Sequence, residues 1–284
     1  MRAVLRLFRI EYCLYGAAGV LYAAAVAGDL PLLRPEILIA VLAVLLAAIG
    51  SYALDDYYDL PEDRASGRND RPLVTGELSP RFALGAGVAA FAAAAILATQ
   101  IHLMAALVVY VSIPLTFLYN LKLKRVFLMK NLVIAGAFVA PLLVGALATD
   151  GTVEPIVAYG AVLMFVLGMG FEVMIDIPDL RGDRELGVAT IPTRYGPRAA
   201  ASVAAGFYLL VMIMDPLPFF VPIDDRFQGN TLFLALIIGP ALSYLFFARS
   251  LLRVHSREAV RTLRRRLFVV WQVGTAAYLL GALL

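Results

Sequence analysis

Two groups of aspartates in this sequence share one spacing. Each follows a long apolar segment and has the pattern D-x-x-D-x-x-x-D; the first ladder is Asp56, Asp59 and Asp63, and the second is Asp176, Asp179 and Asp183. On a helix, positions i, i+3 and i+7 lie on one face, so each pattern predicts a row of carboxylates. Carboxylates without neighbouring His or Cys suit hard cations such as Mg²⁺. Phosphate groups of the substrate usually complete the coordination of Mg²⁺. The predicted chemistry is metal-assisted loss of diphosphate.

Asp55 adds a second register to the first ladder, because it lies four and eight residues before Asp59 and Asp63. We expect the six ladder aspartates to be catalytic. The predicted metal ligands are Asp55, Asp59, Asp63, Asp176, Asp179 and Asp183. Pro61 and Pro178 each remove a helical hydrogen bond, which predicts a kink or a helix end inside each ladder.

Cations near the ladders are candidates for binding a diphosphate, because Arg and Lys pair well with phosphate oxygens. The predicted diphosphate-binding residues are Arg9, Arg68, Arg71, Tyr119, Lys122 and Lys124. A competing interpretation of each basic residue is the general excess of positive charge on the inner face of membrane proteins. For Tyr119 the competing interpretation is an interfacial aromatic belt.

The composition indicates the elements that must hold these residues. With 62% hydrophobic and 16% charged residues and a mean hydropathy of +0.84, the chain is typical of polytopic helical membrane proteins. We expect an all-α protein with nine transmembrane helices, each about 20 residues long, as a bilayer requires. The apolar segments cover 12–30, 36–54, 82–100, 103–120, 132–149, 156–175, 199–214, 231–248 and 267–284. Residues 1–30 also resemble a secretory signal, but we interpret them as the first span.

Basic residues predict the orientation in the membrane. If the N-terminus lies inside, all of the 24 Lys and Arg residues except Arg34 and Arg226 fall in cytoplasmic segments, as the positive-inside rule requires. Both ladders are then cytoplasmic, and we expect the active site on that side of the cell membrane. The basic run Arg249–Arg266 is expected to be a loop that contacts lipid headgroups, with no nucleic acid as partner.

The two ladders also predict an internal repeat. They are four spans and 120 positions apart, so both halves enter the membrane from the same side. We expect two parallel four-helix repeats, roughly 1–125 and 126–250, with a ninth helix appended. Residues 1–284 then form one transmembrane domain.

Three motifs carry a resemblance to a known family. Asp55-Asp56-x-x-Asp59-x-x-x-Asp63 is followed by Arg71-Pro72-x-x-x-Gly76, and the second ladder by Gly187-x-x-Thr190-Ile191-Pro192. The third motif comprises Tyr119-Asn120-x-Lys122-x-Lys124 and Lys130-Asn131. Through these motifs the chain resembles the UbiA superfamily of intramembrane prenyltransferases. The resemblance extends over essentially the whole chain. One departure is Asp55, where the family has Asn.

The resemblance implies an Mg²⁺-dependent transfer of a prenyl group from an isoprenyl diphosphate to a hydrophobic or amphiphilic acceptor. It places the diphosphate between the ladders and the prenyl tail in a tunnel open to membrane lipid. The acceptor is a lipid precursor or an aromatic quinone precursor. The stretch Leu7–Cys13 and the sequence Asp176-Ile-Pro-Asp179 favour geranylgeranylglyceryl phosphate, as in the archaeal branch, and the aromatic acceptor stays open.

Two other classes compete with this interpretation. A cation-coupled transporter of a phosphorylated or anionic solute also uses carboxylates within the membrane, but its sites lie near the midplane between broken helices. Here the ladders lie at the ends of apolar segments. A phosphatidyl-transferring enzyme of the CDP-alcohol type needs D-G-x-x-A-R, and Asp150-Gly151 is followed by Thr152 instead.

Overall fold

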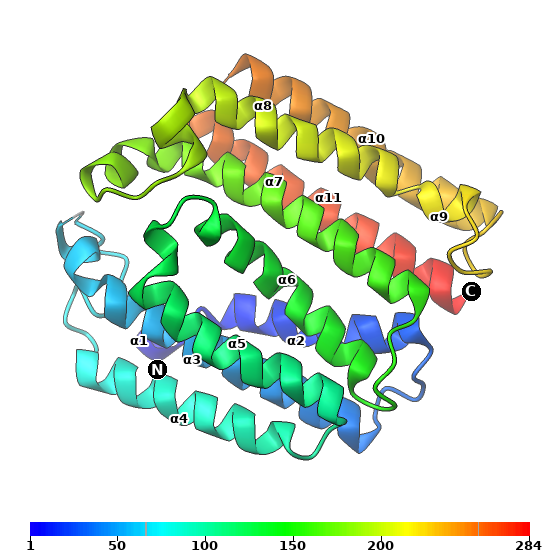
Figure 1. Cartoon of the computed structure of the whole chain (residues 1–284), viewed down its shortest axis with the longest axis horizontal. Coiled ribbons are helices and arrows are strands. Elements are labelled where there is room, and N and C mark those ends of the chain that lie inside the picture. The colour runs from blue at the N-terminus through cyan, green and yellow to red at the C-terminus, as the bar shows by residue number, and fades with distance from the viewer. Residues whose placement is uncertain (66, 255) are drawn as a thin grey trace. The chain divides into compact units, whose positions relative to one another are not determined.

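The computed structural model describes residues 1–65, 67–254 and 256–284, and every regular element in these ranges is a helix (Figure 1). The elements are α1 (Arg2–Leu7), α2 (Ile10–Ala27), α3 (Pro35–Ala65), α4 (Pro80–Ala98), α5 (Leu103–Leu121), η1 (Leu123–Arg125), α6 (Met129–Leu147), α7 (Pro155–Glu185), α8 (Ile191–Met214), α9 (Leu217–Phe220), α10 (Thr231–Arg253) and α11 (Arg257–Leu283). In the described ranges nine helices are long and apolar enough to cross a bilayer. The predicted all-α class and the nine spans are therefore confirmed.

The chain forms two compact units. Unit 1 comprises Met1–Lys124 and Ala140–Val153, and unit 2 comprises Arg125–Val139 and Glu154–Leu284. Helix α6 therefore contributes its first part to unit 2 and its second part to unit 1. Each ladder belongs to a single unit, the first to unit 1 and the second to unit 2.

Helix α3 is the centre of unit 1, where it contacts α2, α4 and α5. The core between these helices is built from small side chains such as Val20, Ala40, Ala94 and Ala105. Small residues allow helix backbones to approach closely, which favours helix association within a membrane. The first ladder is thus carried by the helix that contacts the other three spans of this core.

Unit 2 contains a closed arrangement of four helices, because α7 contacts α8 and α11 while α10 contacts the same two. Its core is rich in aromatic rings. The Tyr208 and Tyr244 rings stack with centroids 6.3 Å apart, and the Phe233 and Tyr278 rings meet edge to face at 5.1 Å. Helix α7, which carries the second ladder, is held between two neighbours.

The helices that carry the ladders continue beyond their apolar segments. Each has 31 residues, about 46 Å of helix, which exceeds a hydrocarbon core of about 30 Å. Pro61 and Pro178 lie inside these helices, so of the two predicted alternatives the helix end is wrong and the kink stays a prediction. A proline removes one backbone hydrogen bond, and the remaining turns keep the helix continuous.

Two further boundaries differ from the sequence prediction. Helix α8 starts at Ile191, eight residues before the predicted span, and contains a break at Gly196, where φ is 85°. Helix α11 starts at Arg257, so most of the predicted basic loop Arg249–Arg266 is helical. An amphipathic pattern explains the second difference, because Val260, Leu263 and Leu267 are buried while the arginines between them are exposed.

Candidate active site

Arg9 is placed on the first ladder by the packing of the N-terminus. Leu7 is fully buried against Leu60, Leu73 and Ala83, which fixes α1 against the last turns of α3 and the start of α4. Arg9 then joins α1 to α2 with a left-handed backbone, φ 46° and ψ 51°. Such a conformation is uncommon for a residue with a side chain and marks positions where tertiary packing sets the backbone.

The guanidinium of Arg9 binds two neighbouring carboxylates. Its Nη2 lies 3.2 Å from Asp55 Oδ2 and 2.6 Å from Asp56 Oδ1, and its Cζ lies 4.8 Å from the centre of the Tyr52 ring. Burial opposes the charge on Arg9, yet the carboxylates of Asp55 and Asp56 outweigh it and raise the pKa of the guanidinium above its ordinary value. Arg9 is therefore a permanently charged part of the site.

Arg71 reaches the ladder from the loop after α3. The loop begins where Gly67 takes a positive φ of 64° and the Arg68 amide donates to the Asp63 carbonyl over 3.0 Å, a Schellman-type helix end. Arg71 Nη1 then donates to Asp56 Oδ1 at 3.1 Å, and its Nε lies 3.7 Å from Asp63 Oδ2. Asp56 is thus bonded by two arginines and has only 2% of its side chain exposed.

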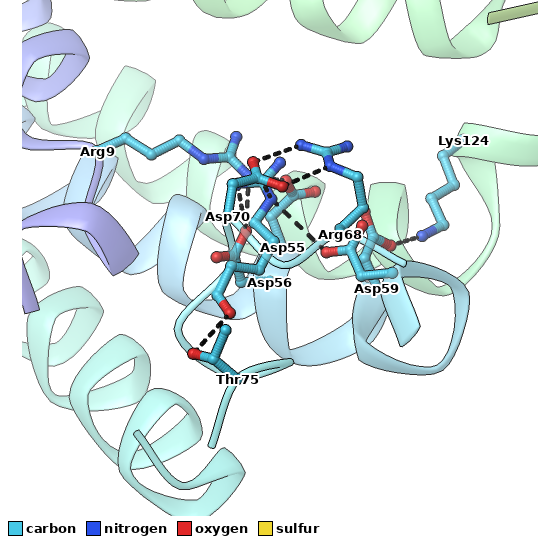
Figure 2. Close-up of polar contacts among 10 residues, drawn as sticks. Arg9, Asp55, Asp56, Asp59, Arg68, Asp70, Thr75 and Lys124 are labelled. Carbon is cyan, nitrogen blue, oxygen red and sulfur yellow. Dashed lines mark hydrogen bonds and ion pairs between the residues drawn. The ribbon is translucent and has the colours of Figure 1, made fainter. Parts of the chain in front are cut away.

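Lys124 supplies a third cation from η1, which follows α5. Its ammonium pairs with Asp59 and lies 3.8 Å from Glu62 Oε2. Figure 2 shows that Arg9 and Lys124 approach the carboxylates of α3 from opposite sides. Three cations are thus shared among five carboxylates in this cluster, which are Asp55, Asp56, Asp59, Glu62 and Asp63.

The second ladder has its own cation at the start of α6. Asp176 is fully buried, pairs with the Lys130 ammonium, and accepts a 2.9 Å hydrogen bond from Asn131 Nδ2. Asp179 is exposed and Asp183 is partly buried. The ladder therefore runs from the interior of unit 2 at Asp176 to its surface.

The end of the second ladder is closed in the same way as the first. Gly187 has a positive φ of 69°, and the Val188 amide donates to the Asp183 carbonyl over 2.8 Å. Thr190 caps α8 in a capping box and places its hydroxyl 3.4 Å from Asp183 Oδ2. The Gly and Thr of the second motif thus fix the helix end and one ladder carboxylate.

The two ladders show one arrangement twice, each within its own unit. A cation at the start of a helix meets the first aspartate of the ladder, with sequence separations of 47 for Arg9 and Asp56 and 46 for Lys130 and Asp176. The last aspartate, Asp63 or Asp183, accepts the amide five residues later. This recurrence supports the parallel repeat, which stays a prediction. The binding of one diphosphate by both ladders also stays a prediction.

The remaining predicted residues are placed differently. Arg68 donates to Asp70 at 3.0 and 3.1 Å, and these hydrogen bonds lower the pKa of Asp70 to about 2. Lys122 is exposed at the C-cap of α5, and Tyr119 is partly buried in the last turn of that helix. Their assignment to diphosphate binding stays a prediction.

Glu172 was not assigned from the sequence. It lies on α7 with 2% exposure, four residues before Asp176. Lys130 and Asn131 were noted only in the resemblance and given no role. The signal for Glu172 is its spacing, since Glu172, Asp176, Asp179 and Asp183 continue one helical face.

The side chains of the two ladders can be compared with the donors that a metal ion requires. Over residues 1–65, 67–254 and 256–284, no three His, Cys, Asp or Glu side chains are arranged as a metal site, and the ladder carboxylates are bonded to cations. The donors are nevertheless hard oxygen atoms that outnumber the cations bonded to them. Asp56 Oδ2 is buried and has no hydrogen-bond partner among the described residues. This donor set fits a hard divalent cation.

The fold and site define a polytopic helical membrane protein with an acidic cluster at the end of two of its spans. Residues 14–272 match the UbiA prenyltransferase family, and the chain belongs to this family. It is therefore an integral membrane prenyltransferase, as the sequence motifs predict. The competing transporter interpretation gains no support from these matches.

Two archaeal relatives of similar length are both named digeranylgeranylglyceryl phosphate synthase. The digeranylgeranylglyceryl phosphate synthase of Archaeoglobus fulgidus is 29% identical over 99% of this chain and 96% of its own length. That of Thermococcus kodakarensis is 32% identical, over 99% of this chain and 98% of its own.

Solved structures share the fold. A digeranylgeranylglyceryl phosphate synthase structure superposes with a TM-score of 0.80 at 21% identity, covering 99% of this chain and 98% of that one. A UbiA homologue from Archaeoglobus fulgidus bound to DMAPP and Mg²⁺ gives a TM-score of 0.69 at 21% identity, covering 97% of this chain and 98% of that chain.

Proposed function

We propose that this protein joins a geranylgeranyl group from geranylgeranyl diphosphate to the hydroxyl of geranylgeranylglyceryl phosphate. The product is the compound named in its relatives, a glyceryl phosphate with two geranylgeranyl groups. The observation that carries the proposal is the cluster on α3, where five carboxylates share Arg9, Arg71 and Lys124. Such a mixture of oxygen ligands and phosphate-binding cations matches a metal-bound diphosphate.

Magnesium is the proposed cofactor, held by Asp56, Asp59 and Asp63 in unit 1 and by Asp176, Asp179 and Asp183 in unit 2. When bound, it neutralises negative charge on the departing diphosphate. Asp55, one of the predicted ligands, stays a candidate. Asp56 is added because its Oδ2 is buried without a hydrogen-bond partner among the described residues, although one oxygen of each carboxylate is bonded to Arg9.

The chain's own cations have separate tasks. Arg9 and Arg71 hold Asp56 in place, and their remaining N–H groups donate to diphosphate oxygens. The Nε atoms of both arginines are buried without a hydrogen-bond partner among the described residues, so they can donate to a substrate. Lys124 and Lys130 are bonded to Asp59 and Asp176, and each would be available to donate to the diphosphate if its carboxylate bound the metal instead.

An assay on membranes that contain the protein tests the proposal. With labelled geranylgeranyl diphosphate, geranylgeranylglyceryl phosphate and Mg²⁺, we expect a labelled diether, and none after chelation with EDTA. Aromatic quinone precursors are the comparison acceptors, and membranes without the protein are the control. Preferred prenylation of an aromatic acceptor, or a product that forms equally well in EDTA, contradicts the proposal.

We also propose that the N-terminus and both ladders face the cytoplasm at the cell membrane, which the distribution of basic residues supports. Single cysteines at the exposed positions Glu77 and Gln228 test this, because the native Cys13 is fully buried. A membrane-impermeant maleimide added to intact cells should label Gln228→Cys, whereas Glu77→Cys should react only after lysis. The opposite labelling pattern contradicts the orientation.

A further inference from the structure

Glu172 is a buried carboxylate that the proposed diphosphate chemistry does not use. It is 2% exposed, and its Oε2 has no hydrogen-bond partner within the described parts of the chain. A buried carboxylate oxygen without a partner costs free energy of folding, because it loses hydration without replacement. A residue kept under such a cost is a candidate for function.

The position of Glu172 is defined by the helix that carries it. Four residues before Asp176, it lies on the same face of α7 and about 6 Å deeper along the axis. On this face Asp179 is exposed while Asp176 and Glu172 are buried. Glu172 is therefore the innermost carboxylate of the row.

The proposed reaction, on which this inference rests, releases a proton at that depth. The bond between C1 of the prenyl group and the ester oxygen breaks, and its electron pair leaves with the diphosphate. The hydroxyl oxygen of the acceptor forms the new bond to C1, and its O–H bond breaks. Because C1 is bonded to an oxygen of the diphosphate, a diphosphate bound at the ladder would keep C1 within a few ångströms of it. A prenyl tail that enters the span would then place C1 on the side of Glu172.

We propose that the Glu172 carboxylate accepts the proton of the acceptor hydroxyl. The groups that face it from the packed elements are Lys130 on α6, Asp176 and Asp179 on α7, and Tyr208 on α8. Burial disfavours the ionised form of the Glu172 carboxylate, and the positive charge of Lys130, which is bonded to Asp176, opposes this effect. The Tyr208 hydroxyl is bonded to the Gly170 carbonyl at 3.2 Å and the Met174 sulfur at 3.3 Å.

Glu172→Gln tests this role, because it keeps the size of the side chain and removes its capacity to take a proton. We expect kcat for transfer to fall by about 10²–10⁴-fold, the range typical of a lost general base. The KM values of both substrates should stay within about twofold. The Mg²⁺-dependent release of diphosphate in the absence of acceptor should also stay within about twofold, since water replaces the lipid hydroxyl at the carbocation.

Two further variants make the result decisive. Glu185→Gln makes the same change at an exposed position of the same helix, and its kinetics should equal those of the wild type. Glu172→Asp retains a carboxylate and should recover part of the transfer rate that Glu172→Gln loses. If Glu172→Gln does not fold, Glu172→Asp serves as the test in its place.

Several outcomes overturn the inference. Unchanged transfer by Glu172→Gln means that the proton goes elsewhere, and equal losses of transfer and of acceptor-free diphosphate release mean that Glu172 acts on the diphosphate. No recovery by a folded Glu172→Asp also contradicts it. Failure of the wild type to prenylate the lipid acceptor would instead contradict the proposed function.

Discussion

Replacing Asp59 by asparagine is expected to lower kcat/KM for prenyl transfer by on the order of 10³-fold, the loss typical when one charge-stabilising group is removed from an active site. Asp183→Asn in unit 2 should have an effect of the same size. Each change removes a negative charge from a proposed magnesium site while the shape of the side chain is kept. The measurement is initial rate in membranes across a range of Mg²⁺ concentrations.

The folded state should survive the first of these changes. Asp59 has 28% of its side chain exposed, so loss of its pair with Lys124 costs about 1 kcal/mol or less. Asp150→Asn is the matched control, because Asp150 also belongs to unit 1 but is exposed and accepts hydrogen bonds from Thr152. Near-normal turnover by Asp59→Asn, or an equal loss in Asp150→Asn, contradicts the metal assignment.

The sequence predicted the membrane helices and the ladders because both depend on local patterns. An apolar segment about 20 residues long and a D-x-x-D-x-x-x-D spacing each determine one feature without knowledge of packing. The ends of the ladder helices were also readable, since Gly67 and Gly187 take positive φ where the helices stop. The sequence could not decide between a kink and a helix end at Pro61 and Pro178. The helices continue, because a helix with turns on both sides of a proline tolerates the loss of one hydrogen bond.

The sequence could not distinguish between the basic residues near the ladders. Arg68 and Arg71 are three residues apart, yet Arg68 binds Asp70 while Arg71 reaches Asp56 and Asp63. The loop conformation decides which arginine points toward α3, and no local pattern encodes that conformation. Lys130 was underestimated for a similar reason, because its contact with Asp176 joins residues 46 positions apart.

The basic segment before the last span illustrates a different limit. Charge alone identified it as a loop, but hydrophobic residues at Val260, Leu263 and Leu267 have helical spacing and are buried. A window that searches for continuous apolar sequence misses an amphipathic start of a helix. Glu172 was missed for the opposite reason, because a single acid within an apolar segment does not interrupt the span.

Replacing Arg9 by alanine is expected to raise the KM for the prenyl diphosphate by about 10- to 100-fold, the equivalent of one lost charge-assisted hydrogen bond. The KM for the lipid acceptor should change by less than about twofold, because the guanidinium lies among the carboxylates proposed to bind the metal and not deeper in the unit. Titration with a non-hydrolysable prenyl diphosphate analogue measures the same loss without turnover.

Arg6→Ala separates the role of Arg9 from that of positive charge in general. Arg6 belongs to the same N-terminal segment, but it is 45% exposed and pairs with the exposed Glu77, so its loss should leave both KM values unchanged. Arg9→Lys should recover only part of the affinity, because lysine keeps the charge but cannot bridge Asp55 and Asp56 while stacking on Tyr52. Full recovery in Arg9→Lys would show that positive charge alone suffices. An equal rise in the KM for both substrates in Arg9→Ala would mean that Arg9 supports the structure around the first ladder and does not bind the diphosphate.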